Sequence, residues 1–165
     1  MVWSPASNAT LTLNVDGAFL SQLTKGGLGG ALRDSRGIVH AAYQIAAPFV
    51  SSALHAELLA IKVGLQLLSL HNFQSVCIQS DCLLVVQDIN GNSTNHTEYG
   101  TLIEDIQFML QQLQQIHVSY TPRTCNKIAH RLANLAFESE QTMYWIQETP
   151  DCIRDIVLKE LPPLT

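Results

Sequence analysis

The chain has 165 residues, 47% hydrophobic and 14% charged, so it is long enough for one domain with a substantial core, and its composition excludes a disordered chain. The formal net charge of −5 argues against a broad electrostatic surface for nucleic acid, so any polyanion must be held by a few clustered basic groups or bound cations. We interpret residues 1–165 as a single domain.

Membrane and secretion signals are not expected in this sequence. Polar residues interrupt every apolar run before it reaches the roughly 20 residues of a membrane span. Residues 1–13 do not carry a basic stretch followed by an apolar one, so a cytosolic or nuclear location is expected. The four cysteines lack C-x-x-C spacing, which favours free thiols over a structural zinc site or a disulfide framework. They are Cys77, Cys82, Cys125 and Cys152.

The first part of the chain predicts an antiparallel meander. Residues 11–19 are β-prone, with apolar side chains at alternate positions, and form the first predicted strand. The glycine-rich residues 26–34 and the apolar residues 38–47 predict two further strands, joined by a tight D-S-R-G turn.

The remaining elements alternate between helices and short strands. Apolar residues recur at spacings of three and four across residues 52–70, where a serine pair can cap the start of a helix. Short strands are predicted at 75–80 and 116–121, and helices at 81–90, 98–114 and 127–140. This order, β-β-β-α-β-α-α-β-α, predicts a mixed sheet with helices on its faces. Residues 141–165 are expected to pack on the body as a C-terminal strap or short helix.

Three acidic residues occupy positions that are unusual for charged side chains. Asp16 lies at the end of an apolar strand, Asp81 directly follows the next predicted strand, and Glu57 lies in the first turns of a helix. Open sheets place ligand sites at strand ends, and carboxylates brought close together repel unless a divalent cation neutralises them. Each acid also has an ordinary explanation: a helix cap, a first-turn acid or a turn residue. Position along the chain leaves both interpretations open.

Five motifs follow one another along the chain. They are L-N-V-D-G-A-F, G-G-L-G-G-A-L-R-D-S-R-G, H-A-E-L-L-A-I, I-Q-S-D-C-L-L-V-V and P-R-T-C-N-K-I-A-H-R-L-A. Together they resemble the plant ribonuclease H-like domains, including those at the ends of plant non-LTR retroelement polyproteins. The resemblance extends from Trp3 to about Glu160. It implies an α/β fold of the ribonuclease H-like type, with a mixed five-stranded sheet of three antiparallel strands and parallel additions, and helices on both faces.

The resemblance also implies an activity. It points to an endoribonuclease that hydrolyses RNA within a duplex, either an RNA/DNA hybrid or double-stranded RNA, with two Mg²⁺ or Mn²⁺ ions held by carboxylates. By that resemblance Asp16 bridges both ions, while Glu57 and Asp81 hold the ion nearer the leaving group. Two ions suit this chemistry, because one activates the attacking water and the other stabilises the departing oxygen.

The chain departs from the family pattern in its last motif. His130 stands in A-H-R-L-A, where the resemblance leads us to expect a fourth acidic ligand in A-D-x-L-A. A neutral imidazole binds Mn²⁺ but is a poor ligand for Mg²⁺, which prefers oxygen donors. His130 is therefore a candidate catalytic residue with three open roles: a weaker ligand, a proton carrier, or a helix histidine that does not ligate. Of the other histidines only His96 is kept as a functional candidate.

Nucleic-acid contacts are predicted near the same motif. Arg123, Lys127 and Arg131 are four residues apart and can share a face towards substrate phosphates. Gly17 has no side chain, so its backbone can approach a ribose closely. Where the family carries DNA-contacting amides, this chain has residues 51–54, S-S-A-L, which leaves room for double-stranded RNA as a substrate.

Two alternatives to an active nuclease remain. His130 and the acidic net charge are also compatible with a catalytically weak or inactive domain that only binds nucleic acid. The fold could instead serve as a protein-interaction module whose amphipathic C-terminal piece meets a partner.

Overall fold

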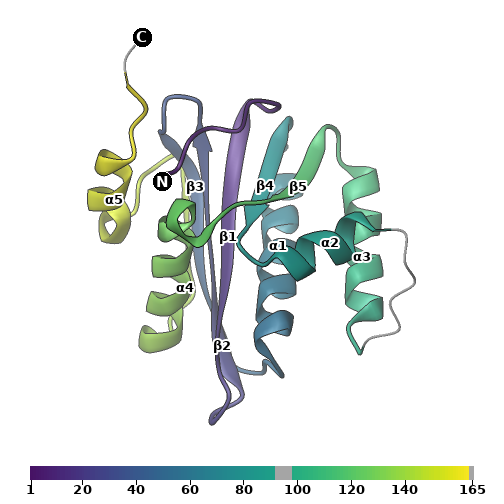
Figure 1. Ribbon diagram of the computed structural model, residues 1–165. Coiled ribbons are helices and arrows are strands. Elements are labelled where there is room, and N and C mark those ends of the chain that lie inside the picture. Colours follow the sequence, from purple (N-terminus) through teal and green to yellow (C-terminus); the bar gives the residue numbers. More distant parts are fainter. Residues whose placement is uncertain (92–97, 164–165) are drawn as a thin grey trace.

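The computed structural model describes residues 1–91 and 98–163 (Figure 1). The candidate His96 lies outside the described residues. All four cysteines are described, and all four are free thiols, as the sequence predicts.

Six strands form one mixed β-sheet. They are β1 (Leu11–Leu20), β2 (Lys25–Asp34), β3 (Val39–Ala47), β4 (Val76–Ser80), β5 (Ile116–Tyr120) and β6 (Met143–Ile146). Their order is β5-β4-β1-β2-β3-β6, with the predicted β1–β2–β3 meander antiparallel and β4 and β5 added parallel to β1. The sheet has six strands rather than the expected five, because part of the C-terminal segment pairs with β3 as the edge strand β6.

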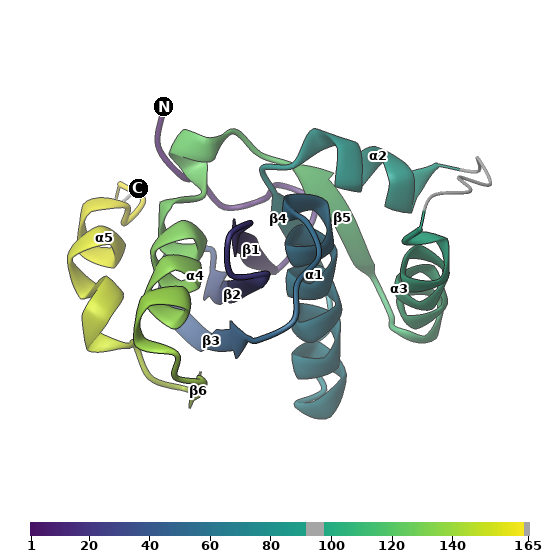
Figure 2. The ribbon, with the colours of Figure 1, turned by 90° about the horizontal axis from the view of Figure 1, so that it is seen from below.

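Five α-helices and two single 3-10 turns complete the described structure. They are α1 (Ala53–Leu70), α2 (Leu83–Asn90), α3 (Gly100–Gln112), α4 (Lys127–Ser139) and α5 (Arg154–Lys159), with 3-10 turns at Arg123–Cys125 and Asp151–Ile153. Ser52 caps α1, and its side chain accepts the backbone N–H of His55 at 3.0 Å, as the serine pair predicts. Figure 2 shows α1 on one side of the central strands and α4 with α5 on the other, so helices cover both faces.

Each face of the sheet has its own hydrophobic core. The larger core joins α1, α2 and α3 to the sheet through residues such as Leu13, Val15 and Ile61. The smaller core joins α4 and α5 to β2 and β3, with Ile128 and Ile156 among its members. β1 separates the two cores because its successive side chains point to opposite faces. Its polar residues on the α4 face therefore meet α4 directly.

Helix α1 is apolar enough by length and composition to cross a membrane, with a mean hydropathy of 1.4 over 18 residues. Half of that stretch is buried inside the protein, and α1 packs on β1 and β2. Its apolar character is explained by this packing, because a helix that faces a core needs a wide apolar stripe.

Two glycines allow helices α1 and α4 to approach the sheet closely within β1 and β2. A Cβ atom at Gly29 of β2 would lie 2.4 Å from the backbone nitrogen of Ala133 in α4. A Cβ atom at Gly17 of β1 would lie 2.4 Å from the carbonyl carbon of Ala56 in α1. Any larger residue would push the helix away. Because Asp16 pairs with Gly29 across β1 and β2, both close approaches occur next to Asp16.

Candidate active site

Two of the three acidic residues lie where the parallel pairing of β1 and β4 stops. The ladder between these strands ends at the pair Val15 and Ser80, and Asp16 and Asp81 are the next residues on each strand. The prediction that Asp16 ends its strand is wrong, because β1 continues to Leu20 and pairs with β2 over that length. Asp16 nevertheless lies at the carboxyl end of the parallel ladder, which is the edge where open α/β sheets place ligand sites.

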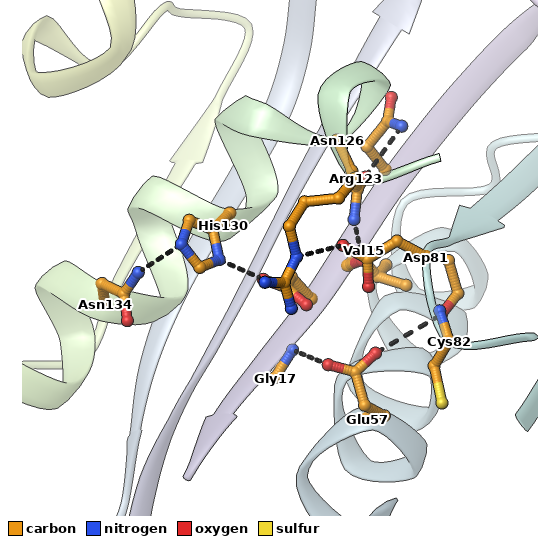
Figure 3. Close-up of polar contacts among 12 residues, drawn as sticks. Val15, Gly17, Glu57, Asp81, Cys82, Arg123, Asn126, His130 and Asn134 are labelled. Carbon is orange, nitrogen blue, oxygen red and sulfur yellow. Dashed lines mark hydrogen bonds and ion pairs between the residues drawn. The ribbon is translucent and has the colours of Figure 1, made fainter. Parts of the chain in front are cut away.

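The third acid, Glu57, reaches the same place from α1. Its Oε1 atom accepts the backbone N–H of Gly17 at 2.9 Å (Figure 3). Its Oε2 accepts the Ser80 hydroxyl at 3.4 Å. One carboxylate oxygen from each of Asp16, Glu57 and Asp81 lies within 4.8 Å of the other two. The structure therefore brings together the three acids that the sequence singled out. We call these three residues the carboxylate cluster.

The ordinary explanations for the three acids do not hold. Helix α2 begins after Asp81 with Cys82 at its N-cap, which makes no side-chain capping bond. The first turn of α1 contains no acidic residue, because Glu57 lies beyond it. Asp16 is paired within a strand and is not in a turn. None of the three is placed by a local structural need, so their convergence requires another reason.

Burial and mutual repulsion raise the proton affinity of the cluster. Burial is the main cause that raises the pKa of Glu57 to about 9, and a hydrogen bond and the negative charge of Asp16 raise it further. The Gly17 N–H acts in the opposite direction and only partly compensates. In the absence of a cation, Glu57 therefore keeps its proton at neutral pH.

Asp81 has an unsatisfied oxygen. Its Oδ2 is buried and has no hydrogen-bond partner, and the guanidinium Nε of Arg123 stands 3.8 Å away, beyond hydrogen-bond distance. Burial raises the pKa of Asp81 first and the charge of Asp16 second, while Asn126, Arg123 and His130 lower it. A buried carboxylate oxygen without a partner is costly unless a further group neutralises it.

The cluster fits a divalent metal ion. It offers three hard oxygen donors at short mutual separation, one of them an orphaned buried oxygen. Mg²⁺, Mn²⁺ and Ca²⁺ prefer carboxylate oxygens of this kind. A bound cation would offset both the burial and the repulsion that keep Glu57 protonated.

His130 contacts the cluster at Asp16 and is not among the three residues that converge. Its Nδ1 lies 2.9 Å from Asp16 Oδ2. Its Nε2 lies 3.0 Å from Asn134 Nδ2 (Figure 3). With Asn134 donating to Nε2, a neutral imidazole carries its proton on Nδ1 and donates it to Asp16. Oriented in this way, His130 holds a carboxylate that belongs to the cluster.

Three supporting residues were missed in the sequence. The fully buried Asn126 donates to the carbonyl of Val15 at 2.9 Å, so it fixes β1 next to Asp16. Asn134 orients His130, and Ser80 orients Glu57. Only Asn134 carried a usable signal, because it lies four residues after His130 on the same helix face.

The residues predicted to contact nucleic acid lie beside the cluster. Some of them line an open groove, and some are already bonded within the protein. Arg123, Lys127 and Arg131 line one groove on the outer side of α4, together with His130. Arg131 is engaged there, since its guanidinium bonds Asp155 at 2.6 Å and the Cys152 carbonyl at 3.2 Å. The Gly17 N–H is directed to Glu57, so this backbone donor is already engaged.

The serine pair that precedes α1 is also engaged. The Ser51 and Ser52 hydroxyls lie 2.7 Å and 2.6 Å from the Tyr99 hydroxyl, and Tyr99 stacks on His55. These contacts join the start of α1 to α3 and occupy the hydroxyls that replace the expected amides.

Comparisons with known proteins agree with this geometry. The family model of reverse transcriptase-like proteins matches residues 14–136. No curated protein matches the chain. The structure of ribonuclease H1 from the halophilic archaeon Halobacterium salinarum is 21% identical with a TM-score of 0.72, over 78% of this chain and 98% of that chain.

Two further solved structures give the same result. LC11 ribonuclease H1, isolated from compost, is 17% identical with a TM-score of 0.72, over 80% of this chain and 98% of its own. The N-terminal ribonuclease H domain of rv2228c from Mycobacterium tuberculosis is 22% identical with a TM-score of 0.69, over 79% of this chain and 95% of its own. The expected ribonuclease H-like fold is confirmed.

Proposed function

The chain belongs to the reverse transcriptase-like family, and from this membership and its carboxylate cluster we propose that it is a metal-dependent endoribonuclease that hydrolyses RNA within a duplex. The observation that carries the proposal is the approach of Asp16, Glu57 and Asp81 to within 4.8 Å. A domain that served only as a scaffold would have no use for three buried acids that repel one another.

In this proposal Asp16, Glu57 and Asp81 hold two Mg²⁺ or Mn²⁺ ions. When bound, the ions supply an activated water and stabilise the departing oxygen. The protein's own contribution is to fix the ligands before substrate arrives. The Gly17 N–H and the Ser80 hydroxyl orient Glu57, and Asn126 holds the backbone of β1 through the Val15 carbonyl.

His130 acts on the cluster through Asp16. Its bond to Asp16 Oδ2 fixes that carboxylate, and Asn134 fixes the imidazole in turn. This relay favours a positioning role at the place where the family pattern expects a fourth acid. One negative charge fewer in the site lowers its attraction for Mg²⁺.

The proposed substrate is an RNA-containing duplex. LC11 ribonuclease H1, which shares this fold, has been solved in complex with an RNA/DNA hybrid. Arg123 stands beside Asp81 and is 80% exposed, so its guanidinium can meet a phosphate that approaches the cluster. Lys127 and Arg131 extend the basic surface along α4.

A side-by-side cleavage assay tests the proposal. Labelled RNA/DNA hybrid, double-stranded RNA and single-stranded RNA are incubated with the protein in Mg²⁺, in Mn²⁺ and in EDTA. We expect cleavage of a duplex only in the presence of a metal ion, and its loss in Asp81→Asn. Asp151→Asn is the matched control, because Asp151 is an exposed acid on a 3-10 turn, away from the cluster, that pairs with Arg154. Cleavage that survives in EDTA or in Asp81→Asn would remove the cluster from the reaction.

A second candidate function is a nucleic-acid-binding domain with little or no catalysis. The observation that favours it is His130 in place of an expected acid. It predicts that every duplex is bound but none is cut in either metal, and that His130→Asp restores cleavage.

A further inference from the structure

A groove of about 530 Å³ lies between the start of α4 and α5, next to the carboxylate cluster. Figures 1 and 2 both show α5 lying beside α4 on the outer side of the sheet. The groove contains four of the nine Lys and Arg residues in an acidic chain. These are Arg123, Lys127, Arg131 and Lys159. Such a concentration of positive charge attracts an anion to this groove and away from the rest of the surface.

The charges of the groove do not cancel. Its two acids already have partners, because Asp155 bonds Arg131 at 2.6 Å and Glu160 bonds the buried Arg33 at 3.0 Å. Within the part of the chain that the structure describes, neither Lys127 nor Lys159 has an acidic partner. Both lysines are exposed. Two free ammonium groups, one from each helix, therefore face the same space.

Helix α5 is held in place by contacts that do not involve these lysines. Arg131 of α4 joins it through Asp155, and Ile156 packs into the smaller core. Residues beyond 136 lie outside the stretch that the reverse transcriptase-like family model matches. Lys159 is thus a cation that this chain's C-terminal helix adds to the α4 surface.

The groove adjoins the carboxylate cluster through two shared residues. His130 lines the groove and bonds Asp16, and Arg123 lines the groove while its Nε stands 3.8 Å from Asp81 Oδ2. A strand whose phosphate lies at the cluster therefore meets Arg123 first and the two lysines next. Lysine ammonium groups bind phosphodiester oxygens as compact point charges.

We propose that the groove between α4 and α5 binds the phosphodiester backbone of the substrate strand beside the scissile phosphate, with Lys127 and Lys159 as its phosphate ligands. The assignment rests on the proposed nuclease function for the identity of the strand. It gives the C-terminal helix a role in substrate binding. In this assignment Arg131 holds α5 in place through Asp155, and the two lysines contact the ligand.

Binding is tested in the full chain with the inactivating Asp81→Asn change as background. Affinity for an RNA/DNA hybrid and for double-stranded RNA is measured by fluorescence anisotropy between 50 and 200 mM salt. The logarithm of the binding constant falls linearly with the logarithm of the salt concentration, and removing two phosphate contacts lowers the size of this slope by about 1.8. The loss of affinity in Lys127→Ala/Lys159→Ala should therefore be about tenfold larger at 50 mM than at 200 mM salt. Arg154→Ala is the control, because it removes one cation from α5 outside the groove and should leave the slope unchanged.

The outcomes separate this proposal from the nuclease proposal. If the salt dependence of affinity is unchanged in the double variant, the proposed role of the groove is wrong, even when the wild-type chain cleaves duplexes. A reduced slope supports the groove, even when no cleavage is found. Titration with inorganic phosphate or a mononucleotide distinguishes a free-anion site. If either binds at the lysines while duplex affinity stays unchanged in the double variant, the strand-binding proposal is overturned.

Discussion

The chain treats its buried acids, Glu160 and the carboxylate cluster, in two opposite ways. Glu160 is 6% exposed and is bonded by the fully buried Arg33, whose guanidinium also stacks 3.7 Å from the ring of Trp3. Glu57 is 8% exposed and accepts only neutral donors, the Gly17 N–H and the Ser80 hydroxyl. The charge of Glu160 is neutralised by Arg33, although its Oε2 has no hydrogen-bond partner. Glu57 has no cationic partner of this kind among the described residues, so without a bound cation it keeps its proton.

The difference indicates what each group is for. Glu160 and Arg33 join α5 and the N-terminal segment to the sheet, so their pairing stabilises the fold. The carboxylate cluster has raised pKa values at Glu57 and Asp81 because burial and mutual repulsion are not compensated. An uncompensated buried charge lowers stability, and such arrangements gather at functional sites. Substitutions in the cluster should therefore lower activity and spare stability. Substitutions in the Arg33–Glu160 pair should lower stability.

The largest effect is expected at the cluster. Asp81→Asn should lower cleavage by more than about 100-fold, the upper end of the losses seen for residues that merely support a metal ligand. Its free energy of unfolding in EDTA should stay equal or rise, because the amide removes a repelling charge and keeps the shape. Cleavage rates and urea unfolding on the same preparation check both expectations. A large loss of stability would mean that Asp81 is a structural acid.

The opposite pattern is expected at the buried ion pair. Glu160→Ala leaves the Arg33 guanidinium buried without its partner, so the free energy of unfolding should fall by about 3–5 kcal/mol. Replacing both residues, as in Arg33→Met/Glu160→Leu, should recover most of that loss because no unpaired charge remains. Urea unfolding measures the two variants. Both should still gain stability from Mn²⁺, and loss of that gain would show that the pair also supports the cluster.

A pH-dependent effect of intermediate size follows from Glu57. Its pKa is raised from 4.5 to about 9 in the folded chain, so between these values the unfolded chain releases a proton that the folded chain keeps. The contribution of Glu57 to stability in EDTA should therefore be complete below about pH 4.5 and be lost as pH rises towards 9, by the order of 1 kcal/mol per pH unit. Thermal unfolding from pH 5 to 9 tests this.

Glu57→Gln should flatten that slope, and Glu104→Gln, on the exposed side of α3, should leave it unchanged. A divalent ion should raise the melting temperature more at pH 8 than at pH 6, because ion and proton compete for the same carboxylates. A slope that persists in Glu57→Gln would assign it to another group.

The fold and the three acids could be predicted because they depend on local patterns. Alternating apolar residues, the serine cap of α1 and the motif order give the elements, and parallel strands bring the residues after Val15 and Ser80 to one edge. The edge strand β6 was missed. It has four mostly exposed residues, and its pairing with β3 depends on a contact across about a hundred positions in sequence.

Apart from Asn134, which lies four residues after His130 on the same helix, the supporting groups could not be predicted, because they depend on contacts between segments distant in sequence. The ion pair between Arg33 and Glu160, and the bond from Asn126 to Val15, join residues more than a hundred positions apart. Gly29 was correctly predicted to lie in a strand. The sequence did not show that its missing side chain allows α4 to pack close to β2. That approach is what brings His130 within 2.9 Å of Asp16.

The smallest expected effect concerns His130. This residue bonds Asp16 of the cluster, and it occupies the position where the family pattern has an acid. His130→Asp supplies a fourth oxygen donor, so it should raise cleavage in Mg²⁺ relative to Mn²⁺ by several-fold and tighten Mg²⁺ binding. His130→Ala removes the bond to Asp16 and should lower the rate about 10- to 100-fold without reversing the metal preference. Asn134→Ala should give a weaker version of the alanine effect, because Asn134 orients the imidazole without touching the cluster. Cleavage rates across a titration of each metal compare the three variants. If His130→Asp fails to shift the metal preference while His130→Ala lowers the rate, the imidazole serves Asp16 and does not stand in for a ligand.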